Sequence, residues 1–153
     1  MAKKMRGLGS TRNRVDSQDG LSTSQIDGLM SPYPDYLGCI GSDQVGTLAI
    51  KPKSRLGFVM NLDPSYKKGS HWIAVFADAR PNGDMSVEYY DPLADPPSRR
   101  MISDAKMIAE KLGAGNYLKF KVNKIADQDD DTANCGYFAC KFLIDRFRGK
   151  SFC

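Results

Sequence analysis

The segment Ser70–Ala77 (SHWIAVFA) constrains the fold of this chain more than any other stretch. It is apolar on both alternations of a β-strand, and such a strand is stable where both faces of its sheet are covered. A turn signal at 81–84 (PNGD) and the segment Ser86–Asp91 that follows it indicate the return strand of a hairpin. We therefore expect a central hairpin in a sheet with helices packed against it.

Weaker patterns complete the expected fold. The glycines between residues 36 and 46 predict turns there. The remaining predicted elements are a short helix capped by Ser22 or Thr23 and ending at Met30, strands at Thr47–Ile50, 57–62 and 117–122, and helices at Ser103–Leu112 and Cys135–Phe147. Strands and helices do not alternate strictly, so the predicted class is α+β. A chain of 153 residues has room for one sizeable core.

The first twenty residues differ from the rest in charge and pattern. They show no hydrophobic period, and residues 1–14 carry five Lys and Arg and no acid. The remaining 17 Lys and Arg face 18 Asp and Glu, so the rest of the chain is close to neutral. We expect a flexible basic arm at 1–20 and a domain at 21–153. The arm is either a solvated tail or a contact for DNA or nuclear import.

Several classes of protein are excluded by composition. No apolar run approaches the roughly 18 residues of a membrane span, and the N-terminus lacks the apolar core of a secretory signal. One histidine and four cysteines without a Cys-x-x-Cys pair do not match a closed zinc site. The cysteines are also too few and too unevenly spaced for a disulfide framework. We expect a monomer in a reducing compartment, not secreted, with no metal and no cofactor.

Cys135 is the first candidate for chemistry. It lies where a polar loop becomes a helix, and the free N–H groups and the helix dipole there favour a thiolate, the nucleophilic form of cysteine. Gly136 leaves room beside the sulfur for a carbonyl substrate. The alternative is a buried structural cysteine, which is our interpretation of Cys140.

His71 is the only imidazole available as a general base near neutral pH. It opens the apolar strand and is followed by the only tryptophan, Trp72, which lines either a cleft or the core. Asp91 ends the return strand, where a carboxylate can orient the imidazole.

The two side chains share a face of the sheet only if the hairpin loop has an odd length. Asp91 then lies opposite Ile73 rather than Ala74. We expect a loop of three or five residues centred near Asn82, with Gly83 in the left-handed region.

Gln128 is the fourth candidate. Its amide lies seven residues before Cys135 and could join the Cys135 backbone N–H in stabilising an oxyanion. A solvated loop glutamine is the alternative.

These residues, in this chain order, resemble a known family. His71-Trp72, Asp91-Pro92, Gln128 and the segment 134–138 (NCGYF) look like motifs of the adenovirus protease (adenain) family, within the ubiquitin-like protease clan. The resemblance implies a papain-like fold in which a central mixed sheet packs against helices and the nucleophile starts a helix. It implies peptide-bond hydrolysis through an acyl-thioester, with Cys135 as nucleophile, His71 as base and acid, Asp91 as its orienter, and Gln128 and the Cys135 N–H as oxyanion hole. Trp72 would flank the substrate cleft.

The resemblance also implies partners. Substrates would carry small residues beside the scissile bond, and an activating peptide and DNA are further candidates, with Cys39 and Cys153 as thiols that could link such a peptide. Residues 5–9 (MRGLG) fit the cleavage pattern of the family, which suggests self-cleavage between Leu8 and Gly9.

Four functions remain open at this point. The first is a viral cysteine endopeptidase that cleaves next to Gly and processes virion precursors, in the virion and in the nucleus or cytoplasm of the host cell. The others are a ubiquitin- or SUMO-specific isopeptidase, an acyltransferase, and a non-catalytic DNA-binding virion protein that retains the fold.

Overall fold

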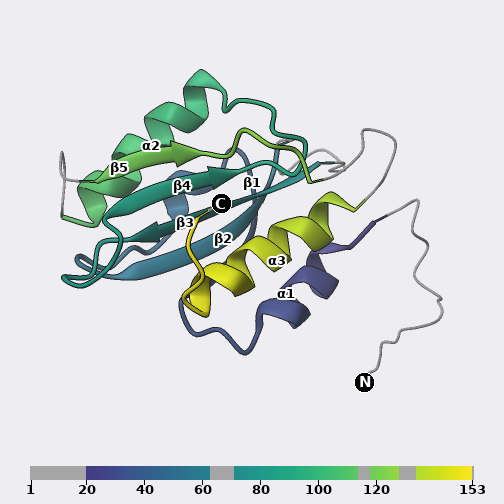
Figure 1. The fold of residues 1–153 in the computed structure, drawn as a ribbon, viewed down its shortest axis with the longest axis horizontal. Coiled ribbons are helices and arrows are strands. Elements are labelled where there is room, and N and C mark those ends of the chain that lie inside the picture. The colour runs from purple at the N-terminus through teal and green to yellow at the C-terminus, as the bar shows by residue number, and fades with distance from the viewer. Residues whose placement is uncertain (1–19, 63–70, 114–117, 128–133, 153) are drawn as a thin grey trace.

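A five-stranded mixed sheet lies between one helix on one face and two helices on the other (Figure 1). The structure is a computed structural model that describes residues 20–62, 71–113, 118–127 and 134–152. Its elements are α1 (Thr23–Met30), β1 (Tyr36–Gly41), the 3-10 turn η1 (Val45–Thr47), β2 (Arg55–Asn61), β3 (Trp72–Asp78), β4 (Ser86–Tyr90), α2 (Arg99–Lys111), β5 (Lys119–Val122) and α3 (Cys135–Phe147). The predicted arm, apart from Gly20, lies outside the described residues.

The strand order is β1-β2-β3-β4-β5, which puts β3 in the middle of the sheet. The β2–β3 and β3–β4 pairs are antiparallel, whereas the outer pairs β1–β2 and β4–β5 are parallel. The mixed sheet with helices on both faces confirms the predicted α+β class.

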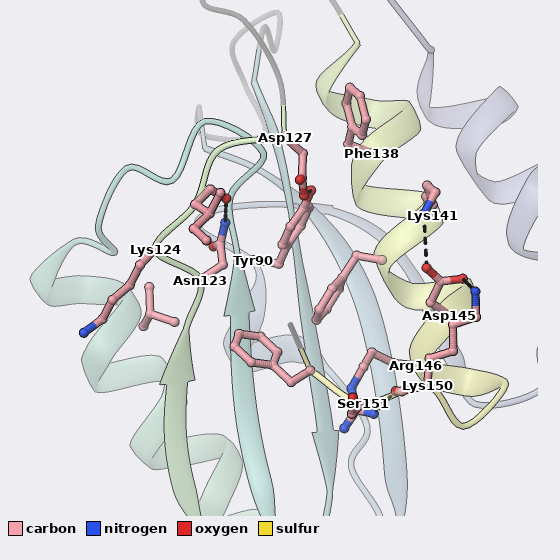
Figure 2. A pocket seen from close by; sticks show the side chains of 14 residues that line it. Tyr90, Asn123, Lys124, Asp127, Phe138, Lys141, Asp145, Arg146, Lys150 and Ser151 are labelled. Carbon is pink, nitrogen blue, oxygen red and sulfur yellow. Dashed lines mark hydrogen bonds and ion pairs between the residues drawn. The ribbon is translucent and has the colours of Figure 1, made fainter.

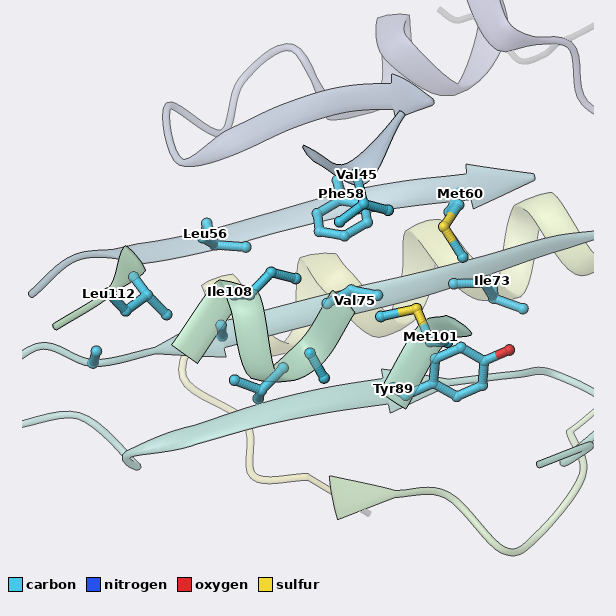
Figure 3. Close-up of a cluster of buried hydrophobic side chains, with 14 residues drawn as sticks. Val45, Leu56, Phe58, Met60, Ile73, Val75, Tyr89, Met101, Ile108 and Leu112 are labelled. Atoms are coloured by element: carbon cyan, nitrogen blue, oxygen red, sulfur yellow. The ribbon is translucent and has the colours of Figure 1, made fainter. Parts of the chain in front are cut away.

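Strand β3 is covered on both faces, as its apolar sequence predicts. Ile73 and Val75 join the core beneath α2, and Figure 3 shows Ile73 near Met101 of that helix. Ala74 and Phe76 face the second core, beneath α1 and α3. The alternation of β3 therefore divides the interior into two layers.

Helix α3 begins at Cys135 and ends at Phe147, as predicted. Its buried residues pack on β2 and β3. Gly57 of β2 allows the last turn to come close, since a Cβ there would lie 2.7 Å from the Phe147 ring and 3.0 Å from Leu143. The start of the helix is thereby held at one end of the sheet.

The β3–β4 hairpin confirms the predicted register and corrects the predicted loop. Ala74 pairs with Tyr90, so continuing the register by one residue puts Asp91 opposite Ile73. The loop spans residues 79–85 and is therefore odd but longer than the three or five residues expected. The left-handed residue is Met85 (φ 54°), not Gly83.

The physical reason lies in the Asp78 side chain. Its carboxylate accepts hydrogen bonds from the backbone and side chain of Arg80, so the loop is built around Asp78 instead of a tight turn. A Cβ on Gly83 would lie 2.2 Å from Asp78 Oδ1. Gly83 is thus required for close approach and not for a positive φ.

Two other predictions were wrong. Residues 36–41 form the edge strand β1 instead of turns, with an irregular register between Tyr36 and Cys39 at Gly38 (φ 120°). The strand predicted at Thr47–Ile50 does not form, because residues 45–47 make a 3-10 turn whose Val45 is buried in the core.

The other elements form with shifted ends. Ser22 caps α1 through a capping box with Gln25, and Ser98 caps α2, which begins at Arg99, four residues before the predicted start. Strand β5 begins at Lys119, and the predicted start at 117 lies outside the described residues.

Candidate active site

Cys135 is the first residue of α3 and is almost fully buried. The backbone N–H of Trp72 donates to its sulfur at 3.3 Å, and the Gly136 N–H also points at it. Asn134, which precedes the helix, makes no side-chain cap. Backbone donors and the positive end of the helix dipole therefore converge on the sulfur and favour a thiolate.

His71 and Asp91 meet at the same end of the sheet. His71 directly precedes β3 and Asp91 directly follows β4. His71 Nε2 lies 2.8 Å from Asp91 Oδ1, and the Asp91 side chain is fully buried whereas 20% of the His71 side chain is exposed. The hairpin register, which gives both residues the same parity, thus brings together the pair that the sequence predicts.

The Asp91 carboxylate fixes the tautomer of the imidazole. Because an ionised carboxylate only accepts hydrogen bonds, Nε2 of His71 is the donor in this contact. Oδ1 also accepts from the Leu93 backbone N–H at 2.8 Å. Nδ1 is then the ring nitrogen that is left for Cys135, and a hydrogen bond joins the two side chains.

The pKa values of both groups move in the direction of an ion pair. Hydrogen bonds with Asp91 and with Cys135 outweigh burial and raise the pKa of His71 to about 10. Burial by itself raises the pKa of Cys135, but the His71 hydrogen bond, the Trp72 N–H and the charge of His71 outweigh it and leave this pKa below the ordinary thiol value. Both shifts therefore favour the thiolate–imidazolium pair over the neutral thiol and imidazole.

The other two described cysteines behave in the opposite way. Burial raises the pKa of both Cys39 and Cys140 to about 12. All three described cysteines are free thiols. Cys135 is thus distinguished from the other two by its partners and not by its depth in the protein.

Trp72 and Gly136 form one wall beside the sulfur. The Trp72 Nε1–H donates to the Leu21 carbonyl at 3.2 Å. A Cβ on Gly136 would lie 3.1 Å from the Trp72 ring and 3.3 Å from both Ile26 and Leu21. The missing side chain of Gly136 thus allows close packing against Trp72, Ile26 and Leu21, and a direct role in binding substrate stays a prediction.

Other candidates lie outside the described residues: Gln128, Leu8, Gly9 and Cys153. The sequence analysis missed two residues. Leu21 accepts a hydrogen bond from the Trp72 side chain, and the Asn123 side chain holds the backbone of Asp91. Neither has a local sequence signal, because each acts through residues distant along the chain.

The described part of the chain holds no group of three or more His, Cys, Asp and Glu side chains that could bind a metal ion. Within the same ranges, no helix is both long and apolar enough to cross a membrane.

Comparisons with known proteins bear on the fold. No family model matches the chain. It is 26% identical over 157 residues to "Putative thiol protease R355" of Acanthamoeba polyphaga mimivirus, a match that covers 89% of this chain and 50% of that protein. The chain thus spans about half the length of this relative.

Two crystal structures of the ASFV pS273R protease superpose with TM-scores of 0.68 and 0.67, at 17% and 19% identity. They cover 89% of this chain and 61% and 60% of the protease. The central domain of Lpg1148 from Legionella pneumophila gives a TM-score of 0.52 at 16% identity, over 87% of this chain and 79% of that domain. The likeness to the ASFV protease confirms the predicted papain-like fold of the ubiquitin-like protease type, whereas the adenain branch stays a prediction.

Proposed function

We propose that this chain is a cysteine peptidase in which Cys135, His71 and Asp91 act together. The observation that carries this proposal is the contact of His71 with both other side chains, Asp91 at 2.8 Å and the Cys135 sulfur on the other side of the ring. A lowered thiol pKa and a raised imidazole pKa are what a nucleophile–base pair requires.

The reaction follows from the protonation states. The Cys135 thiolate attacks the carbonyl carbon of a peptide bond, and the imidazolium of His71 gives its proton to the leaving amine as the C–N bond breaks. Neutral His71 then takes a proton from water, whose oxygen attacks the acyl-thioester. The C–S bond breaks, the carboxylic acid is released, and Cys135 is left as a thiolate beside the imidazolium of His71. Asp91 stabilises the imidazolium in both steps.

Two hydrogen-bond donors would stabilise the oxyanion that forms when the thiolate attacks the carbonyl carbon. The Cys135 backbone N–H is the proposed first donor, because it lies in the first turn of α3, where the backbone N–H groups point along the axis out of the helix. The Gln128 amide is the proposed second donor. Replacing Gln128 by Ala should lower kcat by about a hundredfold or more while leaving the selective alkylation of Cys135 unchanged.

The similarity to a mimivirus thiol protease and to the ASFV pS273R protease supports a viral peptidase, and we propose virion precursor proteins as its substrates. We propose that Trp72 borders the substrate cleft and that small residues such as glycine occupy the positions next to the scissile bond. A panel of Met-x-Gly-x-Gly peptides, ubiquitin and SUMO conjugates and an acetyl-CoA assay separates this reading from an isopeptidase and an acyltransferase. Cys135→Ala is the control in each assay, and a protein inactive in all of them would contradict the proposal.

We further propose self-cleavage between Leu8 and Gly9. Leu21 lies against Trp72 and Gly136, beside the nucleophile. Leu8 lies thirteen positions before Leu21, and at about 3.3 Å per residue that length is enough to reach the sulfur. Intact-mass measurement should show a chain beginning at Gly9 in the wild type but not in Cys135→Ala, and the same N-terminus in both would contradict it.

The remaining partners are proposals that rest on the sequence. The basic arm would contact DNA, and removal of residues 1–8 should then weaken DNA binding in a salt-dependent way. A peptide linked through Cys39 or Cys153 would raise activity in an assay with and without reductant. We propose a monomer that acts in the virion and the host cell, in a reducing environment.

A further inference from the structure

A side-chain amide holds the backbone of Asp91 where the sheet ends. Strand β4 pairs in parallel with β5 through Tyr89 and Val122, the last residues of the ladder. Beyond this point the Asn123 side chain takes over. Its Oδ1 accepts from the Asp91 N–H at 2.9 Å, and its Nδ2 donates to the Asp91 carbonyl at 2.8 Å. Asn123 therefore continues the hydrogen bonding of the sheet by one residue, to the residue that binds His71.

The carboxylate of Asp91 has few other restraints. Oδ1 meets His71 and the Leu93 N–H, but Oδ2, although buried, has no hydrogen-bond partner among the residues that the structure describes. The Asp91 carbonyl also accepts from the Ala94 N–H at 2.8 Å, which closes a turn. The Asp91 N–H donates to Asn123 Oδ1. The position of the carboxylate thus depends on how firmly the backbone of Asp91 is held.

The rest of the segment 123–127 is attached to β4 at a second place (Figure 2). The Tyr90 hydroxyl donates to Asp127 Oδ2 at 2.6 Å, and the Tyr90 ring stacks on Phe142 of α3 with centroids 4.6 Å apart. The Asp127 N–H donates to the Pro92 carbonyl at 2.8 Å. These contacts fix the segment but do not touch Asp91, so they offer a matched control.

We propose that Asn123 is a positioning residue for the Cys135–His71–Asp91 group. By holding Asp91 in place, it keeps the Asp91 carboxylate at hydrogen-bond distance from His71 and so maintains the thiolate of Cys135. This inference rests on the proposed function. Among the described residues, the charged groups that face the His71 ring are Asp91 on one side and Cys135 on the other. A displaced Asp91 lowers the pKa of His71 and thereby raises that of Cys135.

The test is the pH dependence of alkylation at Cys135 by iodoacetamide, followed by mass spectrometry of the full chain. Asn123→Leu keeps the shape of the side chain and removes both hydrogen bonds to Asp91, together with the one from Nδ2 to the Ile125 carbonyl at 3.3 Å. We expect its reactivity to require a pH about one unit higher, with an approximately tenfold slower reaction at pH 6, because one pKa unit is a tenfold change in thiolate fraction. Tyr90→Phe, which loses the Asp127 hydrogen bond alone, should stay within about twofold of wild type.

Thermal unfolding of each variant separates positioning from stability, and Asn123→Ala serves if Asn123→Leu does not fold. A lower melting temperature with an unchanged alkylation profile would overturn the inference. So would a Tyr90→Phe profile shifted as far as that of Asn123→Leu. If wild-type Cys135 reacts no faster than Cys39 and Cys140, the proposed function fails together with the inference. If Cys135 is selective in wild type and unchanged in Asn123→Leu, the inference alone fails.

Discussion

A buried ion pair anchors the last turn of the helix that carries Cys135. Arg146 donates from Nε to Glu88 Oε1 at 2.8 Å and from Nη2 to Glu88 Oε2 at 2.9 Å, and its guanidinium lies 4.6 Å from the centre of the Phe76 ring. Its side chain is 4% exposed and that of Glu88 is 0% exposed. Ser86 also donates to Glu88 Oε2 at 2.7 Å. The carboxylate is thus desolvated and depends on these donors.

Replacing Arg146 by Met leaves this carboxylate buried with the Ser86 hydroxyl as its remaining side-chain donor. Removing one partner of such a pair costs about 3–5 kcal/mol. The matched control is Lys141→Met, on the same helix, because Lys141 pairs with Asp145 at 3.3 Å in an exposed i,i+4 contact. That loss should cost less than about 0.5 kcal/mol.

The assay is urea unfolding followed by far-ultraviolet circular dichroism. Adding Glu88→Gln to Arg146→Met should restore part of the lost stability, because it removes the uncompensated charge while keeping the volume. If Arg146→Met costs no more than Lys141→Met, or if the second substitution restores nothing, the reasoning from burial is refuted.

Three more predictions concern the site and its support. His71→Ala should slow alkylation of Cys135 at pH 7 by at least about tenfold, because burial without the imidazolium raises the thiol pKa; equal rates would contradict the ion pair. The pKa of His71 is about 10 in the folded protein and about 6.5 in the unfolded chain, so protonated His71 stabilises the fold fully below pH 6.5. This stabilisation is lost as the pH rises towards 10, and the free energies of unfolding of wild type and His71→Ala, measured by urea titration, should converge over that window. Gly57→Ala should destabilise the protein by about 1–3 kcal/mol in thermal unfolding, because the new Cβ overlaps the Phe147 ring. Gly28→Ala is the control: it has open space around it and should stabilise α1 by up to about 1 kcal/mol. Equal effects of the two substitutions would argue against the overlap.

Local patterns predicted the elements whose signal lies within their own residues. Strand β3 is apolar on both faces, and α3 begins where a polar loop meets an apolar helix, so both were placed correctly. Strand β1 was missed because its glycines favour turns when considered alone. Its hydrogen bonds come from β2, a parallel partner about twenty residues away, which no local pattern reports.

The residue types of the site could be predicted from the sequence, but the residues that hold them in place could be predicted only in part. The lone imidazole, the cysteine at a helix start and the acid after a return strand are visible in the sequence. The meeting of the imidazole with the acid required only a hairpin of the right parity. Asn123 was not visible, because an asparagine between Val122 and Lys124 looks like any loop asparagine until β5 is paired with β4.

The amino-acid order alone determined that a doubly covered strand, its antiparallel return and a cysteine-initiated helix would form, since each depends on side-chain periodicity and on turn and capping groups close in the chain. The tertiary structure determined that the pKa of the Cys135 thiol is lowered while the pKa values of Cys39 and Cys140 are raised. Cys39, Cys135 and Cys140 share the same chemistry, and burial acts on all three, but folding placed an imidazole and two backbone N–H groups against Cys135 alone among them. Electrostatic interactions depend on distance in space rather than on separation along the chain, so this difference arises when the sheet and α3 come together.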